Sequence, residues 1–350
     1  MINLLFNDSY FQKILLGIVI LAFTTGAIGV FVTERKQALV GDALSHAALP
    51  GVVIAFMIFN TRRIEVLLLG ALIASLISMF LLEIIKRYSK IKFDASMALI
   101  LSSFFGFGNV LMNFLIGSDQ AGLQKFIFGE AATMLQKDVN MIVIVSIVVL
   151  FLAILFWKHI KLYIFDEGFY SSLGFNSKLI SGLLSFLTVL VVIISIRAIG
   201  VVLMSALLIA PAVTARFWSD RLNVNFILAG IFGAIAGIIG TYFSFTVKGL
   251  PTGPVIVVAL SIILIVSLLL SPKKGLIVKA INIKRHKYLI VKYHDLVHLY
   301  QHNEFSTNNI EHLNHYLNKG YITNDNSKYQ LTNKGNTLVN NILRGEKLWV

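Results

Sequence analysis

The sequence contains no cysteine and few charged residues. The absence of cysteine from all 350 residues excludes disulfide bridges, thiolate metal sites and cysteine nucleophiles, so any metal ion must be bound by oxygen or nitrogen atoms. Charged residues make up 13% of the chain and hydrophobic residues 57%, whereas soluble domains have about 25% charged residues. With a mean hydropathy of +0.81, this composition excludes a soluble globular fold for residues 1–271 and predicts an integral membrane protein.

Apolar segments long enough to cross a membrane recur along the chain. Crossing the hydrocarbon core takes roughly 20 apolar residues in a helix, and these segments lack the alternation typical of barrel strands. Backbone groups in lipid must be satisfied within their own segment, so we expect an all-α polytopic membrane protein. Its nine predicted spans lie near residues 11–32, 42–59, 64–85, 94–116, 138–157, 178–196, 198–217, 223–247 and 253–271.

Basic residues indicate the orientation, because cytoplasmic loops carry an excess of Lys and Arg. If the spans alternate, the basic residues gather on one side: Arg35, Lys36, Lys86, Arg87, Lys90, Lys92, Lys158, Lys161, Arg216, Arg221, Lys273 and Lys274. This side is predicted to be the cytoplasm, with the N-terminus outside. The net charge of +13 is explained in the same way and does not require nucleic acid as a partner.

The composition changes at Pro272, after which no segment can span a membrane. We therefore expect two domains, a transmembrane domain at residues 1–271 and a small cytoplasmic tail at 272–350. Apolar periodicity in the tail predicts helices, then two short strands (GYITND and KYQLTNKG), then a last helix.

Asp42 and His46, in GDALSHAALPG, are the two ionisable residues that fall inside apolar segments away from their ends. Such residues are costly at membrane depth and by default indicate function. At positions i and i+4 they share one helix face, so a carboxylate oxygen and an imidazole nitrogen can converge on one divalent cation. Alternatively, Asp42 is an N-cap at the cytoplasmic start of the span and His46 is hydrogen-bonded to a neighbour.

Two prolines within predicted spans suggest interrupted helices. Pro50 has no N–H and so releases the carbonyl of His46, and Pro211 releases that of Leu207. A helix break that lines an ion pathway is typical of transporters. A kink that serves packing is an equally good interpretation of Pro211.

Three ordered stretches, GDALSHAALPGVVIAF, SDQAGLQKFIFGEAATM and AIGVVLMSALLIAPAVTARFWSDRL, resemble the permease subunits of bacterial ABC importers for manganese, zinc and iron. The resemblance covers residues 11–271 and implies that Asp42 and His46 line the metal path. A further stretch, FDEGFYSSLGF at 165–175, resembles the coupling loop that docks on the ATPase. In that loop we expect Asp166 and Glu167 to begin a short helix and Gly174 to end it.

The tail resembles a partial winged-helix module of iron- and manganese-dependent repressors, although only one helix fits between Phe305 and Leu317 where a complete helix-turn-helix needs two. A charged surface that meets anionic membrane lipid explains its basic residues as well. DNA is therefore not an expected partner.

The resemblance implies a permease that imports a divalent metal, with manganese favoured over zinc or iron and no permanently bound cofactor. The chain has no G-x-x-x-x-G-K-[ST] loop, so it is not an enzyme and ATP must be hydrolysed elsewhere. The implied partners are a pair of ATPases, an external metal-binding protein and a second permease, identical or paralogous, in the bacterial plasma membrane. An ion-coupled secondary transporter and a membrane-tethered metal-responsive regulator are the alternatives.

Overall fold

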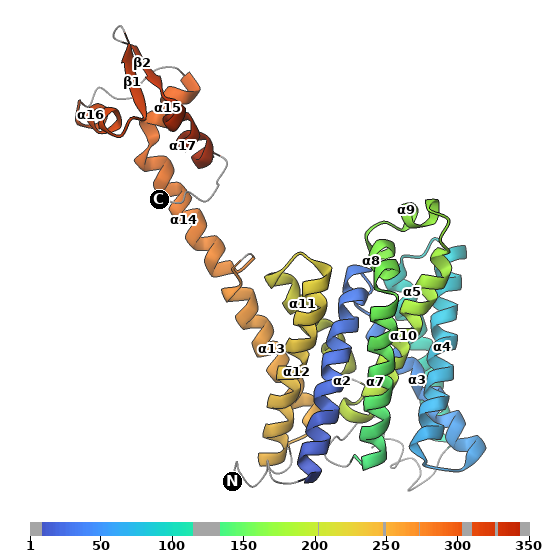
Figure 1. Cartoon of the computed structure of the whole chain (residues 1–350). Helices are drawn as coiled ribbons and strands as arrows, with labels where there is room; N and C mark the ends of the chain where they lie inside the picture. Colours follow the sequence, from blue (N-terminus) through green and yellow to red (C-terminus); the bar gives the residue numbers. More distant parts are fainter. Residues whose placement is uncertain are drawn as a thin grey trace. The chain divides into compact units, whose positions relative to one another are not determined.

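The chain divides into two compact units, Met1–Lys273 and Lys274–Val350. The computed structural model describes residues 9–114, 134–201, 203–247, 250–272, 274–302, 310–325 and 328–343. The motif at 118–134 therefore lies outside the described residues, apart from Met134. Figure 1 shows the elements of both units, which are described separately below.

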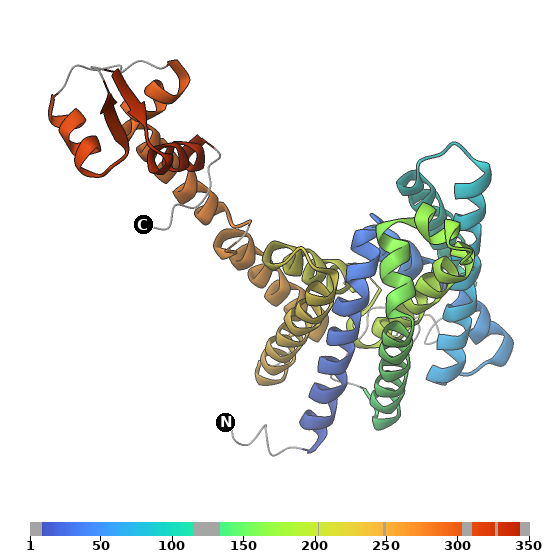
Figure 2. The same ribbon diagram turned by 45° about the horizontal axis from the view of Figure 1, so that its top comes forward.

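The first unit is a bundle of helices (Figures 1 and 2). Eight of the helices within the described residues are long and apolar enough to cross a membrane. Large apolar side chains are exposed along them, as at Ile73, Ile77 and Phe80 of α4, which is typical of a lipid-facing surface. The helices are α2 (Ser9–Glu34), α3 (Val40–Phe59), α4 (Ile64–Tyr88), α5 (Phe93–Asn113), α7 (Gln136–Leu155), α8 (Trp157–Phe165), α9 (Glu167–Ser172), α10 (Ser177–Ile199), α11 (Met204–Trp218), α12 (Leu222–Thr246) and α13 (Thr252–Leu270).

The predicted seventh span, 198–217, differs from the structure. Helix α10 extends to Ile199, Gly200 then adopts a positive φ of 92°, and α11 begins only at Met204. At 1.5 Å per residue, the 15 residues of α11 measure about 22 Å, less than the roughly 30 Å of hydrocarbon. An apolar sequence continues through the turn, so hydropathy alone could not reveal the shorter helix.

Small residues let the backbone of α2 come into contact with the backbones of its neighbouring helices. A Cβ atom on Gly29 would lie 1.7 Å from the carbonyl oxygen of Leu208 in α11, and one on Gly233 of α12 would lie 2.3 Å from that of Ala22. Close packing of this kind holds helices together in lipid, where no hydrophobic driving force acts between them. The same device joins α3 to α4, where Gly51 faces Gly70.

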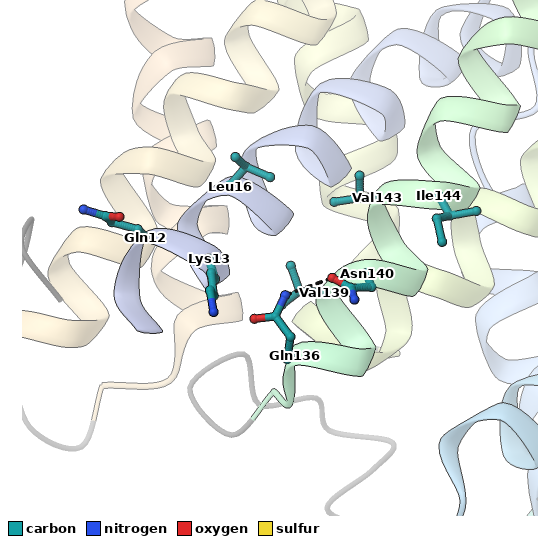
Figure 3. A pocket seen from close by; sticks show the side chains of 8 residues that line it. All are labelled: Gln12, Lys13, Leu16, Gln136, Val139, Asn140, Val143 and Ile144. Atoms are coloured by element: carbon teal, nitrogen blue, oxygen red, sulfur yellow. Dashed lines mark hydrogen bonds between the residues drawn. The ribbon is translucent and has the colours of Figure 1, made fainter. Parts of the chain in front are cut away.

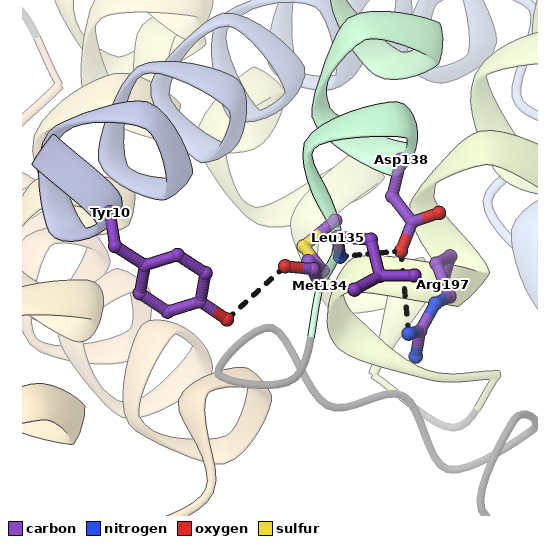
Figure 4. Close-up of polar contacts among 5 residues, drawn as sticks. All are labelled: Tyr10, Met134, Leu135, Asp138 and Arg197. Carbon is purple, nitrogen blue, oxygen red and sulfur yellow. Dashed lines mark hydrogen bonds and ion pairs between the residues drawn. The ribbon is translucent and has the colours of Figure 1, made fainter.

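Polar contacts join three helices at the end of the bundle where α2 begins, called the N-terminal end below (Figure 4). The Tyr10 hydroxyl donates to the carbonyl of Met134 at 3.2 Å, and the Leu135 N–H donates to the Asp138 carboxylate at 2.9 Å. Asp138 of α7 also pairs with Arg197 of α10 at 3.4 Å, and both side chains are largely buried. This ion pair fixes the first turn of α7 against the last turn of α10.

The second unit contains helices and one small sheet. Its elements are α14 (Leu276–Lys292), α15 (His294–His302), α16 (Ile310–Asn318), β1 (Ile322–Asp325), β2 (Lys328–Leu331) and α17 (Asn333–Leu343). The two strands pair antiparallel, with Ile322 opposite Leu331, so the predicted strands are confirmed. Leu296, Leu299, Tyr316 and Val339 belong to the core. The winged-helix likeness stays a prediction.

Candidate metal path and coupling element

Helix α3 carries both predicted metal ligands and follows α2 after a short turn. It begins at Val40, and Leu39 occupies the N-cap position without a side-chain hydrogen bond. Asp42 is therefore the third helical residue, and the N-cap alternative is wrong. In the first turn the partial positive charge of the helix N-terminus stabilises the Asp42 carboxylate.

Asp42 and His46 are the accessible residues of the first part of α3. Both are half-buried, whereas every other residue from Val40 to Val53 is buried. Since they are four residues apart on one helix, their side chains lie on the same face. This face is open in the isolated chain and displays a carboxylate and an imidazole.

The pair lies near mid-depth of the bundle. The Ser75 hydroxyl donates to the carbonyl of Leu44, between Asp42 and His46, at 3.2 Å. Ser75 is the twelfth of the 25 residues of α4, so Leu44 lies beside the centre of that helix. Asp42 itself lies in the first turn of α3, a helix long enough to cross a membrane.

His46 contacts α5 through its ring. The rings of His46 and Phe105 meet edge-on with centroids 4.8 Å apart. His46 Nδ1 is buried and has no hydrogen-bond partner within the described part of the chain, although buried ring nitrogens are normally satisfied. The alternative of a histidine that is merely hydrogen-bonded to a neighbour therefore has no support in the described residues.

Both proline-containing helices are continuous, which corrects the prediction of helix breaks. Pro50 lies inside α3 and Pro211 inside α11. Each proline removes one hydrogen bond, and close packing around it holds the helix together. A Cβ atom on Gly108 of α5 would lie 3.0 Å from Pro50, and one on Gly26 of α2 would lie 3.2 Å from Pro211. The His46 carbonyl still lacks its usual donor, because Pro50 has no N–H.

No group of three or more His, Asp or Glu side chains that could hold a metal ion occurs among the described residues. Within the described residues Asp42 and His46 therefore offer two side-chain ligands, which carbonyl oxygens, water or atoms from another chain can supplement. Incomplete ligation suits an ion that passes through a site more than one that stays there.

The predicted coupling segment forms the short helix α9 and its flanking turns. The Asp166 carboxylate caps the helix by accepting from the Phe169 N–H at 2.8 Å, and Glu167 is the first helical residue. Gly174 has a φ of +83° and follows the end of the helix. The sequence thus predicts this helix correctly at both ends, while its docking on an ATPase stays a prediction.

Aromatic contacts pack α9 against α8 and the turn that follows α9. Tyr170 is 3% exposed, and its ring stacks on Phe175 at 5.2 Å and meets Tyr163 of α8 edge-on at 6.0 Å. Its hydroxyl lies 3.3 Å from His159 Nδ1. Burial raises the pKa of Tyr170, so the phenol stays neutral. The α8–α9 hairpin is consequently a packed element.

A groove between α2 and α7 lies at the N-terminal end (Figure 3). Its volume is about 430 Å³. Polar Gln12, Lys13, Gln136 and Asn140 lie toward the helix starts, and Leu16, Val143 and Ile144 lie further along the helices. Polar residues at the helix ends, followed by apolar residues further along, are typical of the lipid-facing surface of membrane spans. None of the predicted site residues lines this groove.

Sequence reasoning missed three residues around the site, namely Arg35, Ser75 and Phe105. Ser75 and Phe105 fall inside apolar runs where nothing distinguishes them from other span residues. Arg35 was grouped with the basic residues that set the orientation, but it is half-buried and contacts α8 and α10. Its neighbour Lys36 is exposed, and only the structure separates the two.

Comparisons with known proteins agree with this arrangement. The profile of the ABC 3 transport family matches residues 7–271. The zinc transport system membrane protein TroC of Treponema pallidum is 43% identical over 276 residues, covering 78% of this chain and 93% of TroC. The manganese transport system membrane protein MntC of Bacillus subtilis is 38% identical over 302 residues, covering 85% of this chain and 69% of MntC.

A solved structure, PsaBC from Streptococcus pneumoniae in complex with Fab, superimposes with a TM-score of 0.69 at 28% identity. The match covers 83% of this chain and 98% of the chain in that structure. The fold and the sequence thus define a polytopic permease subunit of the ABC importer class, which leaves ATP hydrolysis to a separate subunit. The chain belongs to the ABC 3 transport family.

Proposed function

We propose that this chain carries a divalent transition metal ion across the bacterial plasma membrane as the permease of an ATP-driven importer, with manganese favoured over zinc or iron. Family membership supports the importer. The relatives support the metal, because MntC proteins of Bacillus subtilis and Listeria monocytogenes are named for manganese and TroC is named for zinc. None of these three is named for iron.

The observation that carries the proposal is the half-buried pair Asp42 and His46 near mid-depth of the bundle. A carboxylate oxygen suits manganese, and imidazole suits zinc and iron as well, so the donors select the class of ion more than one metal. The carbonyl oxygen of His46, which lacks its usual hydrogen-bond donor, adds a third metal-binding atom to the carboxylate and the imidazole within one helix turn. Pro50, which frees it, thereby contributes to the path, whereas Pro211 contributes through packing.

The proposed partners are those of an ABC importer. Without a nucleotide-binding loop it needs a pair of ATPases, and the α9 hairpin with Asp166, Glu167 and Gly174 is where they dock. An external metal-binding protein delivers the ion. A second permease, identical or paralogous, covers the open face of α3. We place the Lys274–Val350 unit in the cytoplasm, beside anionic lipid and without a nucleic-acid partner.

The test is competitive uptake of radioactive manganese, zinc and iron by cells that lack this gene and carry the wild-type or variant protein. Asp42→Asn removes the charge at constant size, and His46→Leu removes the imidazole. Each should lower uptake by about tenfold or more at equal membrane abundance, as for lost metal contacts. Asp94→Asn is the matched control, because Asp94 is an exposed acidic residue in the first turn of α5.

Three results would contradict the proposal. Near-wild-type uptake by Asp42→Asn would remove Asp42 from the path. Uptake that continues after inactivation of the partner ATPase would instead indicate an ion-coupled secondary transporter. Loss of a transcriptional response without loss of uptake would indicate a membrane-tethered regulator.

A further inference from the structure

The connection between α2 and α3 is a structured turn. Helix α2 closes with the Gln37 N–H donating to the Val32 carbonyl and the Lys36 N–H donating to the Thr33 carbonyl, both at 3.0 Å. Lys36 has a φ of 58°. These are the bonds of a Schellman motif, with Lys36 in the left-handed position that glycine usually takes. The Val40 N–H then donates to the Gln37 carbonyl at 3.0 Å, so the turn leads into α3 without a flexible link.

Arg35 extends from this turn into the elements that support α9. Its guanidinium donates to the Ser181 hydroxyl of α10 at 3.1 Å and lies 5.9 Å from the ring centre of Tyr163 in α8. Burial lowers the pKa of Arg35, while Tyr163, Glu83 of α4 and Glu167 of α9 act in the opposite direction. A guanidinium remains charged under such conditions. Both glutamates therefore favour the charged form of Arg35.

The contacts form a continuous chain from the coupling helix to the metal ligands. Tyr170 of α9 meets Tyr163, Tyr163 lies under Arg35, and Arg35 belongs to the turn that ends at Val40. Asp42 follows Arg35 by seven residues and is held in the first turn of α3. Packed side chains and rigid elements of this kind carry coupling between distant sites when they have two arrangements.

We propose that Arg35 is a positioning residue that transmits displacement of the α8–α9 hairpin to the start of α3, and so moves Asp42 and His46 together during the ATPase cycle. This inference rests on the proposed function. Glu34, one residue earlier, pairs with Arg216 of α11 at 3.4 Å. The turn is thus held on its other side by α11, and Arg35 is its contact with the coupling side.

The experiment compares Arg35→Gln, Arg35→Lys and the matched control Lys36→Gln in the assembled importer, reconstituted in vesicles. Lys36 is the exposed neighbour, so its replacement removes the same charge without the buried contacts. Three quantities are measured for each variant: ATPase co-purification, manganese binding to the permease, and manganese transported per ATP hydrolysed.

Arg35→Gln should keep ATPase co-purification and manganese binding near those of the wild type, and should lower the transport-to-hydrolysis ratio by roughly fivefold or more. Arg35→Lys should be intermediate, because a lysine keeps the charge but cannot reproduce the planar contacts to Ser181 and Tyr163. Lys36→Gln should keep the wild-type ratio.

An unchanged ratio in Arg35→Gln, or a parallel loss of assembly and transport, would overturn the proposal and leave a structural role. If Arg35→Gln does not fold, Ser181→Ala replaces it, since that change removes the bond to Arg35 and leaves the arginine in place. ATP-dependent uptake by the unaltered importer in the same vesicles tests the proposed function separately. Failure of that uptake and failure of the Arg35 inference are therefore distinguishable.

Discussion

At the residue scale, Gly51 and Gly70 show how little space separates α3 from α4. A Cβ atom on Gly51 would lie 2.1 Å from the Gly70 carbonyl oxygen and 2.6 Å from the Ala74 side chain. The obstacle is backbone, so no side-chain rotation can relieve it. The helix that carries Asp42 and His46 is therefore in direct backbone contact with α4.

We predict that Gly51→Ala destabilises the protein by about 1–3 kcal/mol, the usual cost of overpacking a tight contact. Thermal unfolding in detergent should show a lower Tm for this variant. The control is Gly182→Ala, where a Cβ atom meets nothing within 4 Å. Equal Tm values for the two variants would show that the α3–α4 contact is looser than described.

The two metal-path residues should behave as one unit. If Asp42 and His46 bind the same passing ion, the Asp42→Asn/His46→Leu double variant should take up manganese little more slowly than either single variant, because residues that act together are non-additive. The measurement is initial uptake rate at equal membrane abundance. Losses that multiply would mean that the two side chains act at separate steps.

The sequence predicts the pairing of Asp42 with His46 but not their depth. Spacing of four residues suffices for the first, since helical geometry fixes which side chains share a face. Their depth depends on where the turn at residues 35–39 places α3 along α4. The Ser75–Leu44 hydrogen bond shows that this place is the centre of α4. Nothing in the apolar run starting at residue 38 indicates where α3 meets α4.

At the element scale, α9 depends on its caps, because six residues are too few to form a stable helix alone. Asp166→Ala removes the cap and should cost about 1 kcal/mol, whereas Asp166→Asn should retain it. We therefore expect weaker co-purification of the partner ATPase with Asp166→Ala only. If both variants bind the ATPase like the wild type, α9 is not the docking element.

Gly174 allows a separate test of the same element. Its φ of +83° is strained for a β-branched residue, so Gly174→Val should displace the connection to α10. We expect reduced metal-stimulated ATP hydrolysis by the assembled importer, with normal insertion of the permease. Normal stimulation would contradict the assignment of this turn to coupling.

Element boundaries were predicted well where capping residues mark them and poorly where apolar sequence is continuous. Asp166 and Gly174 bracket α9 as expected. The run at 198–217 has no comparable signal except Gly200, so the turn before α11 was predicted at Arg197, a few residues too early. Pro50 and Pro211 were predicted to break helices, but tight packing on neighbouring helices keeps both α3 and α11 intact.

At the scale of the whole molecule, the chain divides into two units between Lys273 and Lys274. Truncation after residue 275 should leave membrane insertion and measurable manganese uptake, because the spans satisfy their own backbone groups and Asp42 and His46 lie in the first unit. The measurement is uptake normalised to membrane abundance. Complete loss of uptake at normal abundance would show that the tail is required for transport.

The pair near mid-depth also has a consequence for charge. A divalent ion brings two positive charges into a region of low dielectric, where uncompensated charge is costly. One chain supplies a single carboxylate there, Asp42, within the described residues. Two identical permeases facing each other would supply two, and the ion would cross as part of a neutral cluster. A partner permease with a neutral residue in place of Asp42 would leave one charge uncompensated, so charge balance favours a pair in which both subunits carry the carboxylate.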